Sequence, residues 1–169
     1  RDVCRHGQPA ADLAVHLHRH RHFRGARDRF RELRPARSGH AADVPERVSI
    51  HRDVWAPSRV TESSYAQVRA EWPYRESLDC VVEAPDGRFA AYCLCWPDDA
   101  NRVGALEPVG VRLAFRRRGL GAAVCTFALE RLHEEGGRQA IVYSKSQEAR
   151  ALYESIGFRA HASLVACHR

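Results

Sequence analysis

Three arginines and two glycines, in the order Arg116-Arg117-Arg118-Gly119-Leu120-Gly121, have the composition of an anion-binding turn. They lie between an apolar run at 103–111 and a helical pattern at 122–135. The first N–H groups of a helix lack intrahelical partners, and the helix dipole adds partial positive charge there. Glycine lets a backbone approach a phosphate without an obstructing Cβ. The stretch predicts a phosphate site at a strand-to-helix turn, although a run of charges can also be a solvated face.

The charges along the helix after this turn fit a bound polyphosphate. A helix built only for stability carries acids in its first turn and bases in its last. Here the arginines stand at the entrance, and Glu130, Glu134 and Glu135 stand at the exit. That inversion costs from a few tenths of a kcal/mol to about 1 kcal/mol, which a polyphosphate at the entrance would offset.

The elements that would position the turn follow from periodicity and turn chemistry. Helices are predicted after Asp43 (with Pro45 just inside) and after Thr61, where Tyr65 and Trp72 would share a face. The remaining predicted elements are a short strand at 30–37, a hairpin of 78–84 with 88–96, a strand at 103–111 interrupted by Pro108, a strand at 139–143, a helix from 147 to a stop at Gly157, and a last strand at 158–167. This order predicts a mixed α/β (α+β) fold, with helices on both faces of a mixed sheet.

Length and composition exclude several classes of protein. The chain has 169 residues, 44% hydrophobic and 28% charged, which is typical of one globular domain with a core. No apolar run reaches the roughly 18 residues of a membrane span, and the first residues show no secretory signal. Most cysteines lie in apolar runs, which favours a reducing cytoplasm. The six are Cys4, Cys80, Cys93, Cys95, Cys125 and Cys167.

The first 28 residues are rich in His and Arg and show little apolar periodicity. We expect residues 1–28 to be a poorly ordered basic extension, or the remnant of a preceding region, and residues 29–169 to be the folded domain. His16, His18, His20 and His22 could bind a metal, but no Cys or carboxylate accompanies them at ligand spacing, so no metal is expected. The absence of Met suggests a processed chain or a fragment.

A net charge of +6 would allow a nucleic-acid partner. Every basic residue counted in that charge is Arg except Lys145, and the arginines are scattered among acids after residue 28. This pattern looks like a compositional bias, and no nucleic-acid-binding motif accompanies it. Nucleic-acid binding is therefore not expected.

Two segments together resemble the GNAT acetyltransferases. Arg116, Gly119 and Gly121 match that family's acyl-CoA signature. A later signature, Ala-x-x-Leu-Tyr-x-x-x-Gly-Phe, is met by Ala149, Leu152, Tyr153, Gly157 and Phe158. The paired motifs are more specific than either alone. The resemblance covers residues 30–165 and implies a central, twisted, mostly antiparallel sheet with splayed middle strands, and acetyl-CoA as the co-substrate.

The resemblance also implies where acetyl-CoA would bind. The strand with Pro108 would open, and the main chain of Val109 and Val111 would bond the pantetheine arm as an added strand does; a bulge without a ligand is the alternative. The diphosphate would bind at the turn, made of Arg116, Arg117, Arg118, Gly119, Leu120, Gly121 and Ala122. Ser146 stands where many members carry an Asn that contacts the pantetheine.

The implied reaction is direct attack of an amine on a thioester. Glu107 is the candidate base, acting through water, and the alternative is a surface carboxylate or a structural ion-pairing carboxylate. Tyr153 is the candidate acid for the leaving thiolate, and a core aromatic is the alternative. The Val109 N–H would polarise the thioester carbonyl.

The acceptor is an amine that the sequence does not specify further than a small molecule or a peptide. The resemblance places Trp55, Tyr65, Trp72 and Tyr74 beside the acceptor pocket, although ordinary packing fits Trp72 better. We therefore predict a cytoplasmic N-acetyltransferase, with a homodimer as one form. The alternative is a non-catalytic module that binds CoA or a partner, such as half of a two-domain protein.

Overall fold

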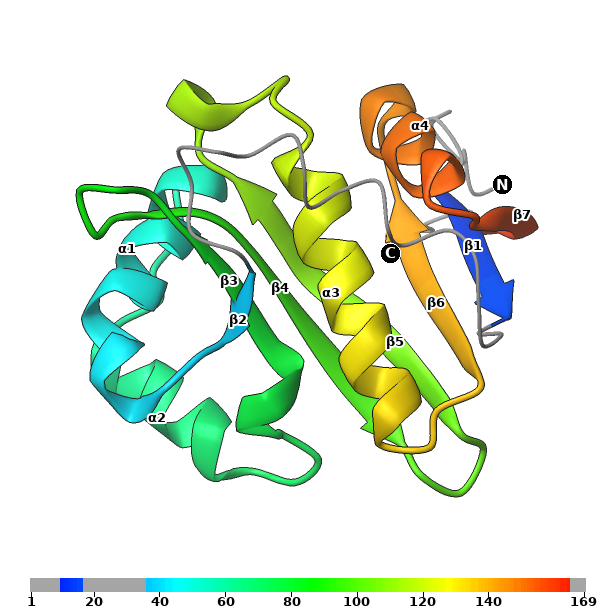
Figure 1. The fold of residues 1–169 in the computed structure, drawn as a ribbon, viewed down its shortest axis with the longest axis horizontal. Coiled ribbons are helices and arrows are strands. Elements are labelled where there is room, and N and C mark those ends of the chain that lie inside the picture. Colours follow the sequence, from blue (N-terminus) through cyan, green and yellow to red (C-terminus); the bar gives the residue numbers. More distant parts are fainter. Residues whose placement is uncertain (1–9, 17–35, 165–169) are drawn as a thin grey trace, which may run out of the picture.

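The computed structural model describes residues 10–16 and 36–164. Seven strands form one sheet in the order β2-β3-β4-β5-β6-β1-β7 (Figure 1). The strands are β1 (Ala10–His16), β2 (Arg37–Ser38), β3 (Asp79–Glu83), β4 (Phe89–Asp98), β5 (Val103–Val111), β6 (Gln139–Ser144) and β7 (Arg159–Leu164). The helices are α1 (Val44–Val54), α2 (Glu62–Ala70), α3 (Leu120–Glu134) and α4 (Gln147–Ser155).

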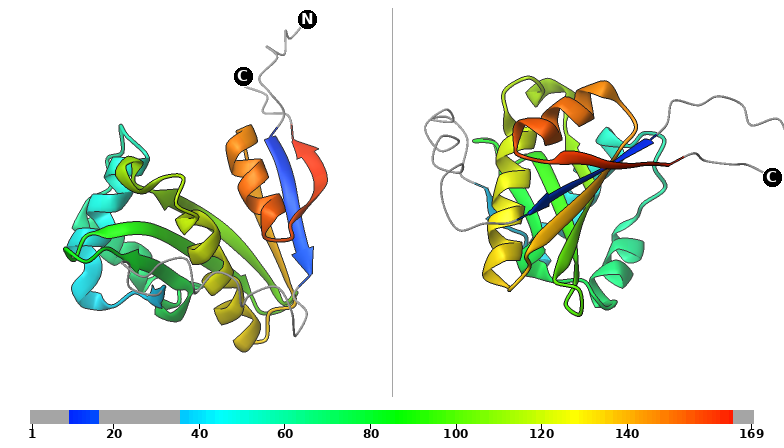
Figure 2. Two further views of the ribbon diagram at one scale, coloured as in Figure 1. Left: turned by 45° about the horizontal axis from the view of Figure 1, so that its top comes forward. Right: turned by 90° about the vertical axis from the view of Figure 1, so that its right-hand side faces the viewer.

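The sheet has the mixed, mostly antiparallel topology that was predicted. All neighbouring strands pair antiparallel except β5 and β6, which pair parallel. The parallel ladder joins only residues 103–105 to residues 139–141, and beyond it the two strands diverge (Figure 2). The sheet is thus two groups of strands that meet at one end, and the fold-class prediction is confirmed.

The helices begin and end where local chemistry directs. Thr61 caps α2, since its hydroxyl accepts a hydrogen bond from the Ser64 N–H at 3.1 Å and the Ser64 hydroxyl accepts from the Thr61 N–H. Pro45 lies in the first turn of α1, as expected. Asp43 precedes that helix but does not cap it, because its carboxylate instead pairs with Arg37.

The core has one layer on each face of the sheet. On one face α3 and α4 pack on the central strands, and the cluster includes Val124, Leu129, Cys93, Leu106 and Tyr153. On the other face α1 packs against β3 and β4 through Ile50, Val81, Phe89, Tyr92 and Val54. Helices on both faces were predicted, and this layering is observed.

Several sequence-based expectations need correction. Ala10–His16, placed in an extension, is a strand paired on both sides, with β6 and β7. Helix α2 ends at Ala70, so Trp72 lies beyond it and is 81% exposed; the packing interpretation for Trp72 was wrong. The strand predicted at 30–37 is described only from residue 36, where β2 covers Arg37–Ser38. The rest of residues 1–28 and the end of the predicted last strand lie outside the described residues.

No helix in the described ranges is long and apolar enough to cross a membrane. Within the same ranges, no group of three or more His, Cys, Asp or Glu side chains is placed to hold a metal ion. His18, His20 and His22, considered above as metal ligands, fall outside them.

Candidate active site

The candidate site begins at a bulge in β5. Cys93 of β4 pairs with Val109, but Cys95, two residues along β4, pairs with Leu106, three residues along β5. One extra residue is therefore accommodated at Glu107 and Pro108. Proline, which has no N–H to give to a ladder, fits such a place. The bulge lies just beyond the residues that pair with β6, where β5 starts to diverge.

Beyond the bulge, the main chain of β5 faces the opening between β5 and β6. The Arg112 N–H donates to the Ala90 carbonyl at 3.0 Å. Because hydrogen-bonded pairs alternate along an antiparallel ladder, Gly110 is the next β5 residue bonded to β4. Val109 and Val111 then direct their N–H and C=O groups away from β4, toward the side on which pairing with β6 has stopped. An extended ligand could bond there as a strand would.

The turn into α3 presents free main-chain donors. Gly119 precedes α3 in the left-handed conformation, with φ at 78°, which is why glycine is suited to this position. No side chain caps the helix there. Arg116, Arg117 and Arg118 are exposed around it. The N-terminus of this fifteen-residue helix is uncapped and surrounded by arginines. It therefore has the donors and the charge to bind a phosphate.

Two details, one at the end of α3 and one at the turn before it, differ from what the sequence predicted. The last turn of α3 carries Arg131 and His133 besides the glutamates, and Arg131 pairs with Glu134, so the charge inversion is only partial. The Arg116 Nε donates to the Val111 carbonyl at 3.2 Å, which folds that side chain back onto β5. The Nε of the Arg116 guanidinium is therefore bonded to β5 and is not free to bind a phosphate.

Gly121 fixes how closely α3 approaches its neighbours. A Cβ at this buried residue would lie 3.0 Å from Leu152 Cδ2 and 3.5 Å from Val111 Cγ2. The first turn of α3 is therefore wedged between the end of β5 and the middle of α4. This contact brings three predicted site segments together: the open edge of β5, the arginine turn and the helix that carries Tyr153.

Tyr153 is held in place by the way α4 ends. Gly157, at φ 101°, stops the helix, and the N–H groups of Gly157 and Phe158 donate to the carbonyls of Glu154 and Tyr153 at 3.1 Å each. These are the two bonds of a Schellman motif, whose hydrophobic contact is made here by the rings of Tyr153 and Phe158, 5.8 Å apart. The Tyr-x-x-x-Gly-Phe spacing thus encodes a helix stop that orients Tyr153.

The environment of Tyr153 favours its protonated form. The residue is 6% exposed, and burial raises the pKa of its phenol well above the ordinary value, with smaller contributions from Cys125, Cys93 and Glu107. Among the described residues, none forms a hydrogen bond with this hydroxyl. The smallest of these contributions is the charge of Glu107, on β5.

Glu107 itself is exposed at the bulge, and no described residue forms a salt bridge with it. Its side chain is therefore accessible to solvent, as a base that works through water requires. Of the two alternatives, a structural ion pair is not seen among these residues, while a surface carboxylate has the same exposure as a base.

The remaining candidates are more dispersed. Ser146 caps α4, its hydroxyl accepting from the Ala149 N–H at 3.1 Å, so a local role accounts for it. Of the aromatics assigned to the acceptor side, Tyr65 is buried and bonded to Asp79. Trp55 is half exposed and donates from its indole N–H to the Tyr92 hydroxyl at 2.7 Å.

Sequence reasoning did not single out Trp96. In the structure its indole N–H donates to the main-chain carbonyl of Glu107 at 2.6 Å. Trp96 was assigned only as the end of a predicted strand. Nothing in the spacing of residues reveals the contact, because it depends on the bulge that changes the register between β4 and β5.

Solved structures with the same fold belong to known acetyltransferases. A GCN5-related N-acetyltransferase from Sphaerobacter thermophilus aligns with a TM-score of 0.76 and 17% identity over 90% of this chain and 48% of its own. A glucosamine N-acetyltransferase region of a fungal multi-domain beta-N-acetylglucosaminidase aligns with a TM-score of 0.72 and 18% identity, over 92% of this chain and 20% of its own. The ribosomal-protein-S18-alanine N-acetyltransferase from Escherichia coli aligns with a TM-score of 0.62 and 22% identity, over 75% of this chain and 78% of its own.

These identities establish a shared fold only. The chain spans about half of the length of the Sphaerobacter protein and a fifth of the fungal one. A search of curated protein sequences gave no match. The family model of the acetyltransferase (GNAT) family, by contrast, matches residues 47–158, which is well over half of the sequence. This match runs from within α1 to just beyond α4 and covers the whole candidate site, and the chain therefore belongs to the GNAT acetyltransferase family, whose members use acetyl-CoA.

Proposed function

We propose that this chain transfers the acetyl group of acetyl-CoA to a primary amine by direct attack. The observation that carries the proposal is the opening of β5 beside an uncapped α3. Arg116 bonds the Val111 carbonyl, and the other outward main-chain groups of Val109 and Val111 suit the amide groups of the pantetheine arm. The turn at residues 116–122 suits the diphosphate. The edge of β5 and this turn both lie against α4, which carries Tyr153.

The chain's own groups then have distinct tasks. Glu107, exposed at the bulge, accepts the proton that the attacking amine loses, through a water molecule. The Val109 N–H donates to the carbonyl oxygen as negative charge develops on it. As the C–N bond forms and the C–S bond breaks, Tyr153, kept protonated by its burial, gives its proton to the leaving thiolate.

The acceptor is proposed only as a primary amine on a small molecule or a peptide. A homodimer and a cytoplasmic location, both expected from the sequence, remain part of the proposal. Because the chain spans only part of the first structures it resembles, the alternative of a non-catalytic CoA-binding module is the outcome to test against.

The test is thiol release from acetyl-CoA with a panel of small and peptide amines, together with calorimetry of acetyl-CoA binding. We expect binding and amine-dependent release in the wild type, and much slower release for Glu107→Gln with binding retained. Binding without release for every amine favours the module. No binding at all overturns both interpretations.

A further inference from the structure

At the bulge in β5, the side chain of a tryptophan bonds a main-chain carbonyl group. The extra residue at Glu107 and Pro108 interrupts the pairing of β5 with β4. The Glu107 carbonyl accepts a hydrogen bond of 2.6 Å from the indole N–H of Trp96. In the register of the sheet Trp96 pairs with Ala105, so its ring must extend along β5 to reach the bulge.

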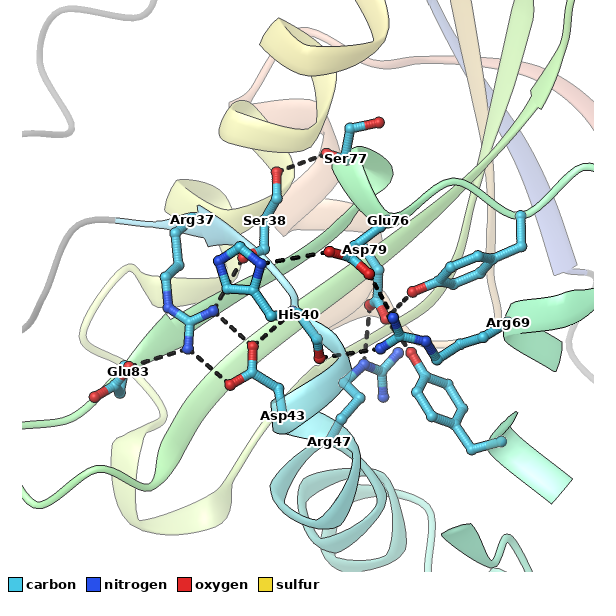
Figure 3. A network of polar contacts seen from close by, with 12 residues as sticks. Arg37, Ser38, His40, Asp43, Arg47, Arg69, Glu76, Ser77, Asp79 and Glu83 are labelled. Atoms are coloured by element: carbon cyan, nitrogen blue, oxygen red, sulfur yellow. Dashed lines mark hydrogen bonds and ion pairs between the residues drawn. The ribbon is translucent and has the colours of Figure 1, made fainter. Parts of the chain in front are cut away.

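The indole is supported from the side of α1 and α2. The ring of Tyr74 packs edge-on against it, with 6.4 Å between centroids and 68° between planes. The Tyr74 hydroxyl donates to Asp79 at 3.3 Å. Asp79 also accepts from Arg47, whose Nε lies 2.9 Å away, within the polar network of Figure 3. The support for Trp96 therefore ends in a buried ion pair, where both side chains are 3% exposed.

The bonded carbonyl belongs to the peptide that controls both candidate groups of the bulge. Holding the plane between Glu107 and Pro108 limits the direction in which the Glu107 side chain leaves the strand. The ring of Pro108 fixes its own φ near −65°. The orientation of the peptide between Glu107 and Pro108 therefore restricts the orientation of the next peptide, which carries the Val109 N–H. Only the ψ torsion of Pro108 remains free between the two peptides.

We propose that Trp96 is a positioning residue, whose indole N–H anchors the bulge so that the Glu107 carboxylate and the Val109 N–H point into the opening of β5. This inference rests on the proposed acetyl transfer, because it assigns Trp96 a part in that reaction. Trp96 itself touches no reacting atom. It acts through the main chain of Glu107.

The test removes the indole N–H and little else. Trp96 is replaced in the full chain by benzothienylalanine, in which sulfur takes the place of the N–H, and by phenylalanine in a second variant, Trp96→Phe. Trp72 is the matched control for the acetyl-CoA readout alone, since it is 81% exposed, forms no hydrogen bond with any described residue, and was assigned to the acceptor side and not to the acetyl-CoA site. The same benzothienylalanine is placed at position 72.

The first readout needs no acceptor amine. Acetyl-CoA labelled with ¹³C at the thioester carbonyl is bound to each protein, and its carbonyl resonance is measured by NMR. A donated hydrogen bond from Val109 polarises the carbonyl and moves the resonance downfield. We expect a smaller downfield shift in both Trp96 variants, with the dissociation constant of acetyl-CoA within about two-fold of wild type. The position-72 variant should match wild type.

The second readout is turnover with the best amine of the panel. Misplacement of the two groups should lower kcat roughly 10- to 100-fold, with a much smaller change in KM for acetyl-CoA. A general loss of structure would change both, and would lower the thermal midpoint of unfolding as well.

The two possible failures are distinguishable. If wild type binds no acetyl-CoA, the proposed function falls. If wild type binds and shifts the carbonyl resonance, and the Trp96 variants give the same shift and the same kcat, the anchor has no role in positioning and this inference is overturned.

Discussion

Among single residues, Tyr153 has the most unusual surroundings. Its ring packs on Phe158, yet no described residue is bonded to its hydroxyl. The residue is 6% exposed, but its hydroxyl oxygen is not among the buried polar atoms of the described residues that lack a partner, so it reaches the surface of the site. A hydroxyl placed at that surface can bond a substrate atom, which is the task that the proposed function gives it.

Tyr153→Phe should therefore lower turnover without harming the fold. Loss of general acid catalysis predicts a fall in kcat of about 100-fold or more, with acetyl-CoA affinity and the thermal midpoint close to wild type. Steady-state kinetics, calorimetry and thermal unfolding measure the three quantities. Wild-type kcat in this variant would show that Tyr153 is only a core residue.

Tyr65→Phe is the matched control for this substitution. Tyr65 is equally buried, but its hydroxyl is bonded to Asp79 on the other face of the sheet. Its removal should lower the thermal midpoint and leave kcat nearly unchanged. The two tyrosines are thus expected to give opposite patterns.

At the scale of elements, the close approach of α3 to α4 and β5 decides whether the phosphate turn is correctly placed. Gly121→Val would drive a larger side chain against Leu152. Overpacking of this kind typically costs about 1–3 kcal/mol, part of which we expect as displacement of the first turn of α3. Acetyl-CoA affinity should fall at least roughly ten-fold, or about 1.4 kcal/mol, while circular dichroism still reports a folded chain.

A second substitution separates displacement from other causes. Adding Leu152→Ala to Gly121→Val removes the side chain that a Cβ at 121 would meet first. The helix can then return, and affinity measured by calorimetry should recover at least in part. Unchanged affinity in Gly121→Val alone would refute the assignment of this turn to acetyl-CoA.

The short strand β2 is fastened to α1 by a different kind of contact. Arg37 donates to both carboxylate oxygens of Asp43, at 2.7 and 3.0 Å, and also to Glu83 (Figure 3). The hydrogen bond from Arg37 is the largest cause that lowers the pKa of Asp43 below its ordinary value. A lowered pKa means that the folded state holds the charged form more strongly than the unfolded state does.

Asp43→Asn should therefore destabilise the chain in a pH-dependent way. The stabilisation is fully present above the unfolded pKa of Asp, about 3.9, and is lost as pH falls through the lower folded value. At pH 7 we expect a loss of about 1 kcal/mol, discounted because Arg37 is one-third exposed. Thermal unfolding should show wild type and variant converging below about pH 4; an equal gap at pH 7 and pH 3 would contradict this.

For the whole molecule, the decisive property is that its two groups of strands meet only at one end. A ligand bound between them, on β5 and the start of α3, would add a second connection. Acetyl-CoA at 100 times its dissociation constant should stabilise the fold by about 2.7 kcal/mol. Hydrogen exchange should slow at the amides of residues 107, 109–111 and 119–122. Stabilisation without protection at those residues would place the ligand elsewhere.

The sequence predicted the elements whose signals are local. Thr61 and Gly157 mark helix ends through bonds to neighbours a few residues away, and Pro45 marks a helix start through its fixed φ. These ends are found where expected. The acyl-CoA and Tyr-Gly-Phe motifs also located the site, because each is a helix end with its own local chemistry.

What the sequence could not predict depends on contacts between distant segments. Strand β1 is stabilised by pairing with residues more than a hundred positions away. No periodic pattern in residues 10–16 predicts this strand. The bond from Trp96 to Glu107 requires a register shift that only the assembled sheet defines. Trp72 was assigned to a helix face because the spacing continued, although α2 had already ended.

Because β1 lies between β6 and β7, the stretch of sequence that matches the family is shorter than the stretch that forms the sheet. The stretch that matches the family model, residues 47–158, contains every group assigned to chemistry but neither β1 nor β7. Cut out alone, it would leave β6 with an open edge, and exposed strand edges invite pairing between molecules. A catalytic core trimmed to its recognisable sequence would then aggregate, and the weakly patterned start of the chain would be what keeps it monodisperse.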